Sequence, residues 1–257
     1  IWQTADIVDS LGGFPVIANV DNDPELEIAF TTRYTYYVLN GEDGSIHWTY
    51  SGNGFQDGST GRTGSTAFDF DGDGRAEIVH SDNYQFRIFD GLPDPNNPSS
   101  GVVLWSTASP SPTITEYPVI ADVDADGLAE LVITNSGSIS SLQVFENDNW
   151  QPANRIWNQH NYHITNVNYD GTIPTSEANN WELYNNYRAA LYTENCATPT
   201  VDLISSSISR TDIIADEVIL SANIANQGDV SVSTGVDISF YSGDPDNGGV
   251  WLATTQT

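Results

Sequence analysis

The chain has no lysine, no methionine and a single cysteine, and these absences limit its chemistry before any motif is considered. With Cys196 alone, no disulfide can form within the chain, so this thiol stays free or pairs with a thiol outside it. Basic residues are scarce: seven arginines stand against 35 acidic residues, giving a formal net charge of -28. Nucleic acid and anionic membranes would be repelled by such a chain, which argues against both as partners.

Long apolar runs are also missing. No stretch approaches the roughly 18 apolar residues of a membrane helix, and no basic-then-apolar signal segment opens the chain. The 7 Trp, 12 Tyr and 9 Phe argue against disorder, because disordered chains are poor in aromatic residues. The acidity therefore indicates a folded protein that binds cations or tolerates salt. Because the sequence begins at Ile1 rather than Met, we expect a processed or excised piece, and secretion is inferred from the repeats described below.

Three segments, about fifty residues apart, superpose without gaps. They are PVIANVDNDPELEIAF (15–30), STAFDFDGDGRAEIVH (65–80) and PVIADVDADGLAELVI (118–133). Each is followed by an alternating strand, a turn and a strand that closes on Trp48, Trp105 or Trp157, and we interpret Trp48 and Trp105 as core residues. A repeat of this length with about four short strands cannot hold a core alone and is typical of a β-propeller blade. A β-sandwich with coincidental acidic turns is the alternative.

The chain begins inside such a repeat, because Ile1-Trp2 matches the closing strand of the later ones. Either a larger propeller is cut here, or this strand closes a small ring onto the final blade, and we favour the fragment. Residues 149–195, rich in Asn and Trp, form a degenerate last segment of the propeller domain, 1–197, with a short helix expected around residues 181–191.

The residue pattern of the sequence changes after residue 197. Alternating strands separated by Asn, Gly and Asp turns, such as EVILSANIANQG, predict an immunoglobulin-like β-sandwich over residues 198–257. Such a domain usually needs ~100 residues, so this one is truncated or completed by something else. A strand from a neighbouring subunit could complete it by β-augmentation. The predicted fold class is all-β: propeller blades followed by an incomplete sandwich.

The acidic loops inside the repeats have the spacing of calcium ligands. Oxygens at loop positions 1, 3 and 5 converge on one side of a tight turn, position 7 adds a backbone carbonyl, and Glu at position 9 closes the cage. Calcium takes about six to eight hard oxygen ligands, whereas magnesium prefers to keep its waters. The predicted ligands of the second and third loops are Asp69, Asp71, Asp73, Arg75 and Glu77, and Asp122, Asp124, Asp126, Leu128 and Glu130.

A preference of Asp, Asn and Gly for turns explains any one of these loops, but not the same carboxylate set twice. Two further loops depart from the pattern. The first repeat offers Asn19, Asp21, Asp23, Glu25 and Glu27. Pro24 there replaces the glycine of position 6 and cannot adopt a positive φ, so we expect lower affinity or an altered geometry.

The fourth candidate follows the spacing of the helix–loop–helix calcium loop. Its residues are Asn166, Asn168, Asp170 and Glu177. An ordinary Asx-rich turn is the alternative for this segment.

No catalytic constellation accompanies the loops. The sequence has no nucleophile-elbow serine, no phosphate loop and no cysteine cluster for zinc. His160 and His163 could form a metal pair, but packed or solvated histidines are the simpler interpretation. Among carboxylates outside the loops, such as Glu116 or Glu182, no sequence pattern identifies a general acid or base. We therefore predict that the protein is not an enzyme.

The segments VDNDPELEI, FDGDGRAEI and VDADGLAEL, each followed by a strand, a turn and a strand ending in Trp, resemble FG-GAP or VCBS repeats. These are the calcium-loop propeller blades also found at the head of integrin α chains. The resemblance covers about residues 1–195 and departs at Pro24 and in the missing early blades. LSANIANQGDVSV resembles CARDB-type immunoglobulin-like adhesion modules. The resemblance implies a secreted or surface-attached bacterial protein whose blades are braced by Ca²⁺ at the positions given above.

Together these observations predict a calcium-binding extracellular module for adhesion or surface assembly. Its expected partners are other proteins, or copies of itself, at a cell surface or in a filament. Two alternatives stay open. One is a lectin-like propeller that binds glycans between its blades, and the other is the accessory propeller of a polysaccharide-active enzyme whose active site lies on the missing blades.

Overall fold

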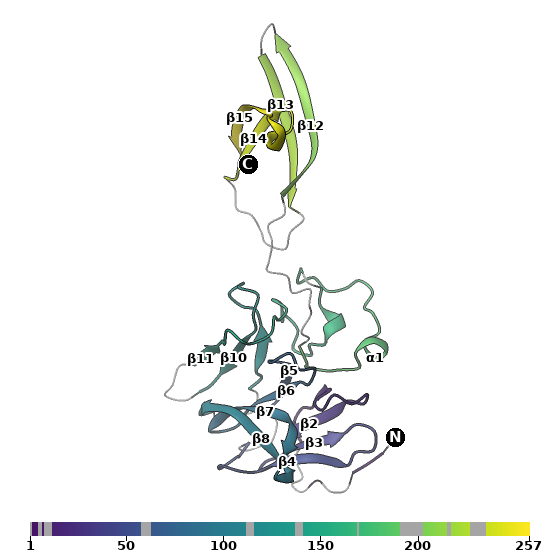
Figure 1. The fold of residues 1–257 in the computed structure, drawn as a ribbon. Coiled ribbons are helices and arrows are strands. Elements are labelled where there is room, and N and C mark those ends of the chain that lie inside the picture. Colours follow the sequence, from purple (N-terminus) through teal and green to yellow (C-terminus); the bar gives the residue numbers. More distant parts are fainter. Residues whose placement is uncertain are drawn as a thin grey trace. The chain divides into compact units, whose positions relative to one another are not determined.

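The computed structural model describes residues 2–4, 7, 12–57, 63–111, 116–136, 141–168, 170–190, 203–214, 217–226 and 235–257. The chain divides into two compact units, Ile1–Ala197 and Thr198–Thr257. Cys196 and Ile1 lie outside the described residues. Both units are built from β-strands, so the all-β prediction is confirmed (Figure 1).

Three antiparallel meanders follow one another in the first unit. The first contains β1 (Val16–Ala18), β2 (Glu27–Thr31), β3 (Tyr36–Asn40) and β4 (Ile46–Tyr50). The second contains β5 (Ser65–Phe68), β6 (Glu77–Ser81), β7 (Gln85–Asp94) and β8 (Asn97–Ala108). The third contains β9 (Val119–Ala121), β10 (Glu130–Thr134) and β11 (Leu142–Phe145). Within each meander, strands that follow one another in sequence pair side by side.

The meanders are arranged as successive blades. The first strands lie next to one another, because β1 contacts β5 and β5 contacts β9. On the outer side, β4 and β8 meet through one parallel pair, Thr49 with Ser100, which joins the first two meanders into an eight-stranded sheet. This order, with the first strands gathered and each sheet meandering away from them, is that of propeller blades.

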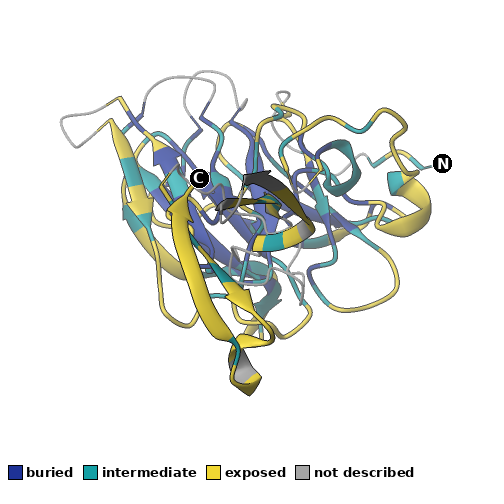
Figure 2. Ribbon diagram, turned by 90° about the horizontal axis from the view of Figure 1, so that it is seen from above, coloured by how far each residue is buried: buried dark blue, intermediate teal, exposed yellow. Residues whose placement is uncertain are grey.

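The core lies between successive blades, as expected for repeats that are too small to enclose one. One apolar cluster joins the first and second blades and includes Val38, Trp48 and Phe89. Another joins the second and third blades and includes Phe86 and Leu131. Burial is therefore concentrated in the strands of the first unit (Figure 2).

The closing tryptophans differ in their surroundings. Trp48 is fully buried, and its indole N–H donates to the Gly91 carbonyl at 2.7 Å, so its interpretation as core is confirmed. Trp105 packs against the rings of Phe86 and Phe145 but is 39% exposed, so it is only partly a core residue. Trp157 lies in no strand; it packs against the second cluster from an irregular segment, and the strand expected there is absent from the described residues.

The degenerate segment returns to the start of the propeller. Tyr187 exchanges two backbone hydrogen bonds with Ile17 of β1 in an antiparallel bridge, each of 3.0 Å. Ala67 of β5 forms a parallel bridge with Ala189, through bonds to the backbone of Arg188 and Ala190. Arg188, between them, is buried and lies 4.4 Å from the centre of the Tyr117 ring. The helix expected nearby is a single turn, α1 (Asn180–Leu183), and a 3₁₀ turn, η1, covers Ile164–Asn166.

The second unit contains two antiparallel ladders. One pairs β12 (Leu203–Ile214) with β13 (Glu217–Asn226), and the other pairs β14 (Asp237–Ser242) with β15 (Val250–Gln256), across a 3₁₀ turn, η2, at Pro245–Asn247. The immunoglobulin-like assignment stays a prediction. In the part of the chain that the structure describes, no helix has the length and apolar character that crossing a bilayer requires.

Strand β6 is buried along its whole length, so the protonation state of its polar side chains affects the stability of the fold. His80 is fully buried against Tyr36 and Phe55, and its Nδ1 lies 3.0 Å from Ser65 Oγ. Burial, with a smaller contribution from the charge of Arg87, lowers the pKa of His80 from 6.5 to about 3. Between these values the unfolded chain takes up a proton that the folded chain does not, so stability falls as the pH falls.

We expect the free energy of unfolding of the wild type to fall by about 2 kcal/mol more than that of the His80→Gln variant between pH 7 and pH 5. Urea unfolding at several pH values, with calcium held constant, measures this difference. Equal pH slopes for the two proteins would show that His80 is not held neutral by its surroundings.

Candidate metal centres

Each acidic loop connects the first strand of a blade to its second strand. The pairing of these strands places position 9 opposite the residue just before the loop: Glu27 faces Ala18, Glu77 faces Phe68, and Glu130 faces Ala121. The ladder therefore brings the last predicted ligand back beside the first. This local pairing explains why a Glu nine residues into the loop can close a cage.

Backbone N–H groups hold the carboxylates in the same way in all three loops. The position 9 Glu accepts from the N–H of position 2, with distances of 3.0, 2.8 and 2.7 Å at Val20, Phe70 and Val123. The side chain at position 1 accepts from the N–H of position 4, at 2.6, 2.7 and 2.7 Å. Positions 3 and 5 accept from the N–H two residues further along the chain. The three loops thus share the backbone hydrogen bonds made to positions 1, 3, 5 and 9.

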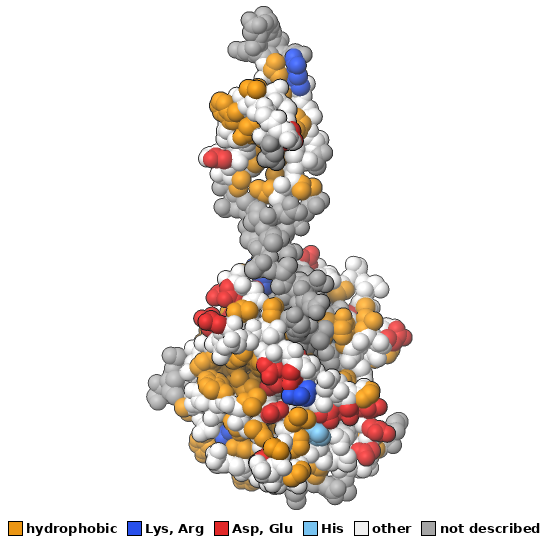
Figure 3. Space-filling model, viewed as in Figure 1, with side chains coloured by type: hydrophobic (Ala, Val, Ile, Leu, Met, Phe, Trp, Pro, Cys, Tyr) orange, Lys and Arg blue, Asp and Glu red, His pale blue; other side chains and the backbone are white. Residues whose placement is uncertain are grey.

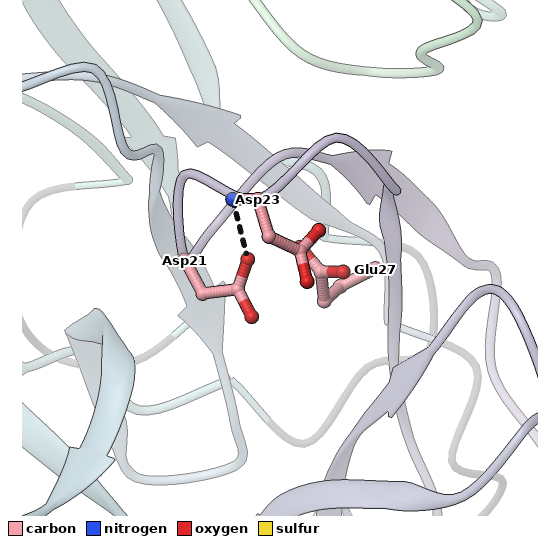
Figure 4. Close-up of side chains that lie close together, drawn as sticks. All are labelled: Asp21, Asp23 and Glu27. Carbon is pink, nitrogen blue, oxygen red and sulfur yellow. Dashed lines mark hydrogen bonds between the residues drawn. The ribbon is translucent and has the colours of Figure 1, made fainter.

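The carboxylates converge as a result. One ligand atom from each of three acidic residues lies within 4.8 Å of the other two in every loop. The groups are Asp21, Asp23 and Glu27; Asp69, Asp71 and Glu77; and Asp122, Asp124 and Glu130. In the first loop the three side chains point toward one another, and the Asp23 N–H donates to Asp21 at 3.1 Å (Figure 4).

Burial destabilises the ionised form of these carboxylates. Loss of solvation, together with the charges of neighbouring loop carboxylates, raises the pKa of Glu27 to about 7 and that of Glu77 to about 8, against the opposing effect of backbone N–H groups. Desolvation also raises the pKa of Glu130. Glu130 is only 2% exposed, and its Oε1 is buried without a hydrogen-bond partner in the described structure. An unpartnered buried carboxylate oxygen among other carboxylates suits a hard cation.

The first loop turns differently, as Pro24 requires. In the other two loops position 6 is a glycine with φ of 91° or 98°, and its N–H donates to the second oxygen of the position 1 Asp. Pro24 has no N–H to donate. Asn19 supplies a donor instead, because its amide Nδ2 bonds the Asp23 carbonyl at 2.6 Å. Asn19 and Pro24 therefore form a matched pair: where position 6 has no N–H to donate to position 1, position 1 carries an amide that donates within the loop itself.

In the second loop an arginine competes for one ligand. Arg75, at position 7, forms an ion pair with Asp73, and both side chains are about one-third exposed. Asp73 is not in the group that Asp69, Asp71 and Glu77 form. In the third loop position 7 is Leu128, which leaves Asp126 without such a partner.

The fourth candidate consists of separate local contacts. Asp170 accepts from the N–H of Thr172 at 2.9 Å, which is the Asx turn of the alternative interpretation. Glu177 bonds the Thr165 hydroxyl at 2.7 Å and His163 Nε2 at 2.5 Å. Asn166 and Asn168 bond backbone and side-chain groups of their own segment.

The other residues considered from the sequence have individual roles. His160 is exposed, with its ring 4.7 Å from that of Tyr117, and does not share the partners of His163. Glu116 is buried and accepts from the Ser111 hydroxyl, whereas Glu182 is exposed on α1.

One acidic residue was missed by the sequence analysis. Glu146 forms a further group with Asp124 and Asp126, again within 4.8 Å. It follows Phe145, the partner of Leu131, and so comes opposite Glu130. Asn40 and Asp90 take the same place opposite Glu27 and Glu77, but this equivalence depends on strand pairing and is not visible in the aligned sequences, where Glu146 lies further from Glu130.

The matched pair in the first loop leads to a prediction. Replacing Asn19→Asp and Pro24→Gly together restores the carboxylate and the N–H that bonds it, and a hydrogen bond to a charged group contributes ~1.5–3 kcal/mol. We expect calcium to bind this loop roughly tenfold more tightly in the double variant, and by more than the two single effects combined. Calorimetric titration of the four proteins measures the coupling. Additive effects would show that the two residues are independent.

The ion pair in the second loop leads to another prediction. Arg75→Gln frees Asp73, and an exposed ion pair contributes ~0.2–1 kcal/mol, so we expect calcium affinity to rise roughly two- to fivefold. Arg33→Gln, which removes the same charge away from the loops, is the matched control. Equal affinity in the wild type and the Arg75→Gln variant would indicate that Asp73 does not take part in binding.

Comparison with known proteins identifies a structural relationship. No family model matches the chain, and no curated protein sequence matches it. The crystal structure of the V. cholerae biofilm matrix protein Bap1 is similar, with a TM-score of 0.57 and 30% identity. The match covers 65% of this chain and 28% of Bap1, so the chain spans a minor part of that protein. This chain is thus an all-β protein with a structural likeness to a biofilm matrix protein, and the FG-GAP or VCBS assignment stays a resemblance.

Proposed function

We propose that this chain is a calcium-binding extracellular module for adhesion or matrix assembly, in which Ca²⁺ braces successive propeller blades. The observation that carries the proposal is the shared loop geometry. In three blades, the same backbone hydrogen bonds gather three carboxylate oxygens within 4.8 Å. Carboxylates with a nearby backbone carbonyl are the ligands that calcium prefers.

The loops lie where a bound cation would act on blade packing. The Asn19 carbonyl, at position 1 of the first loop, accepts from the N–H of Ala76 in the second loop at 2.9 Å. The Phe70 carbonyl of the second loop accepts from Gln151, after the third blade, at 3.0 Å. The first and second loops are therefore each tied to a segment of a later repeat. A cation that orders a loop would also stabilise this contact, because it binds only the folded arrangement.

An extracellular adhesive role is supported by the likeness to Bap1, which is named as a biofilm matrix protein. The surface is suited to cation-dependent contacts, since acidic side chains gather in several places on the visible face of the first unit (Figure 3). Partners of the proposed module are matrix or surface proteins, or further copies of the chain. We infer no enzymatic role. The acidic groups within 4.8 Å of one another among the described residues lie in or beside the loops. The buried carboxylates elsewhere, Asp57, Asp82 and Glu116, are bonded to Thr63, Arg87 and Ser111.

Glycan binding is a second candidate, favoured by a groove beside the first loop. The groove has a volume of about 490 Å³ and is lined on one side by Pro24, Glu25 and Leu26 and on the other by residues of α1. Trp181, on that helix, is 66% exposed. An exposed indole next to carboxylates could stack on a sugar ring while the carboxylates accept hydrogen bonds from its hydroxyl groups.

Retention of the fluorescently labelled chain on a biofilm, with calcium or with chelator, tests the proposal. We expect the wild type to be retained at least tenfold more in calcium, and the combined Glu27→Gln, Glu77→Gln and Glu130→Gln variant to lose this difference. Asp237→Asn, an exposed change in the second unit, should behave as the wild type does. Calcium-independent retention would overturn the role of the loops, and loss of retention in Trp181→Ala alone would favour direct glycan binding in the groove.

A further inference from the structure

We propose that the third loop is a centre for two divalent cations, in which Glu146 completes an outer position beside the inner one formed by Asp122, Asp124 and Glu130. The inference rests on the proposed function, because it assigns a second cation to one of the proposed calcium loops. The first two loops would each hold one cation.

Two ligand groups meet in this loop and share one residue. The inner group is Asp122, Asp124 and Glu130, and the outer group is Asp124, Asp126 and Glu146. Within each group, the ligand atoms lie within 4.8 Å of one another. Asp124 belongs to both groups, so its carboxylate would bridge the two cations. Bridging carboxylates allow two divalent ions to lie a few ångströms apart without direct repulsion dominating.

The buried Glu130 carboxylate is an independent indication that this loop takes a cation. Glu130 is 2% exposed, and its Oε2 accepts the Val123 N–H at 2.7 Å. Its Oε1 is buried and has no hydrogen-bond partner in the described structure. Leaving a charged oxygen buried and unpaired is costly. A cation at the inner position would remove this cost and would place its charge next to the shared Asp124.

The outer group is specific to the third loop for two reasons. At the place of Glu146, the first two blades have shorter side chains that are bound elsewhere: Asn40 Nδ2 donates to Ser45 Oγ at 2.7 Å, and Asp90 accepts from the Leu92 N–H at 2.9 Å. At position 7, the second loop has Arg75, which neutralises Asp73. The third loop has Leu128 there, so Asp126 can act together with Glu146.

The charge of the combined centre also favours two cations. Five carboxylates gather here: Asp122, Asp124, Asp126, Glu130 and Glu146. Arg155, whose charge acts on Asp122, offsets one of them. One divalent ion would then leave two charges uncompensated, whereas two ions would leave none. Mutual repulsion within a few ångströms is strong where solvent is partly excluded, so a second ion is favoured over a single one.

The inner and outer cations should differ in how readily they exchange with ions in solution. Asp122 and Glu130 are buried, so the inner ion would be held by groups shielded from solvent. Asp124, Asp126 and Glu146 are all exposed, so part of the outer ion's coordination shell would face solvent. Water, or an anionic group of a partner, could fill those places. The outer position is therefore the weaker of the two, and it is the one suited to bridging to an acidic partner.

Native mass spectrometry of the full chain in calcium tests the proposal by counting bound ions. At a calcium concentration that saturates the wild type, we expect Glu146→Gln to bind one ion fewer. Asp126→Asn, the second change confined to the outer group, should also lose one ion, and Asp124→Asn should lose two. Glu182→Gln is the matched control and should bind as many ions as the wild type. Circular dichroism establishes that each variant is folded.

The outcomes separate this inference from the proposed function. If the wild type binds calcium and both the Glu146→Gln and Asp126→Asn variants retain the full number of ions, the two-cation centre is overturned while the calcium loops stand. If the wild type binds no calcium at all, both proposals fail together. Loss of one ion in each outer variant, with the control unchanged, supports the two-cation centre.

Discussion

Like charges held at close range are the constraint on which the first unit depends. The strand pairing that begins each blade brings Glu27, Glu77 or Glu130 back beside the aspartates of its own loop. Backbone N–H groups offset part of the repulsion, but burial still raises the pKa of Glu77 to about 8. At neutral pH such a loop either retains a proton or binds a cation. The same charges that destabilise an isolated loop become ligands once a cation is present.

Loop and core are coupled because the hydrophobic clusters lie between blades. Val20, at position 2 of the first loop, is in the cluster that joins the first and second blades, and its carbonyl approaches Gly91 so closely that a Cβ there would come within 1.9 Å of it. Phe70, at position 2 of the second loop, is in the cluster that joins the second and third. In the first two loops the residue next to the first ligand is thus a core residue, whereas Val123 of the third loop is 52% exposed. Cation binding and blade stacking would therefore act as one cooperative event.

Much of this arrangement could be predicted from the sequence where it depends on local spacing. Carboxylates two residues apart, followed by a strand, determine the hydrogen bonds within each loop. The tryptophan that closes the first repeat, Trp48, is fully buried in a blade core, as the sequence indicated. Features that depend on register could not be predicted in this way. Glu146 reaches the third loop only because β11 pairs with β10, and Trp105, which packs against Phe145 of β11, is still 39% exposed. Asn19 and Pro24 lie in the same loop, but their relation can be recognised only by noting that Pro24 has no backbone N–H to donate to position 1.

Thermal unfolding of the full chain, in calcium and in excess chelator at equal ionic strength, tests the central claim that cations hold the blades together. Ligands that bind only the folded state stabilise it by ~2.7 kcal/mol per site at a hundredfold excess over Kd. Since ~1 kcal/mol raises the Tm of a domain of this size by roughly 2–4 °C, three sites predict a shift of more than about 10 °C in calcium. A Tm that is the same in calcium and in chelator would contradict the account.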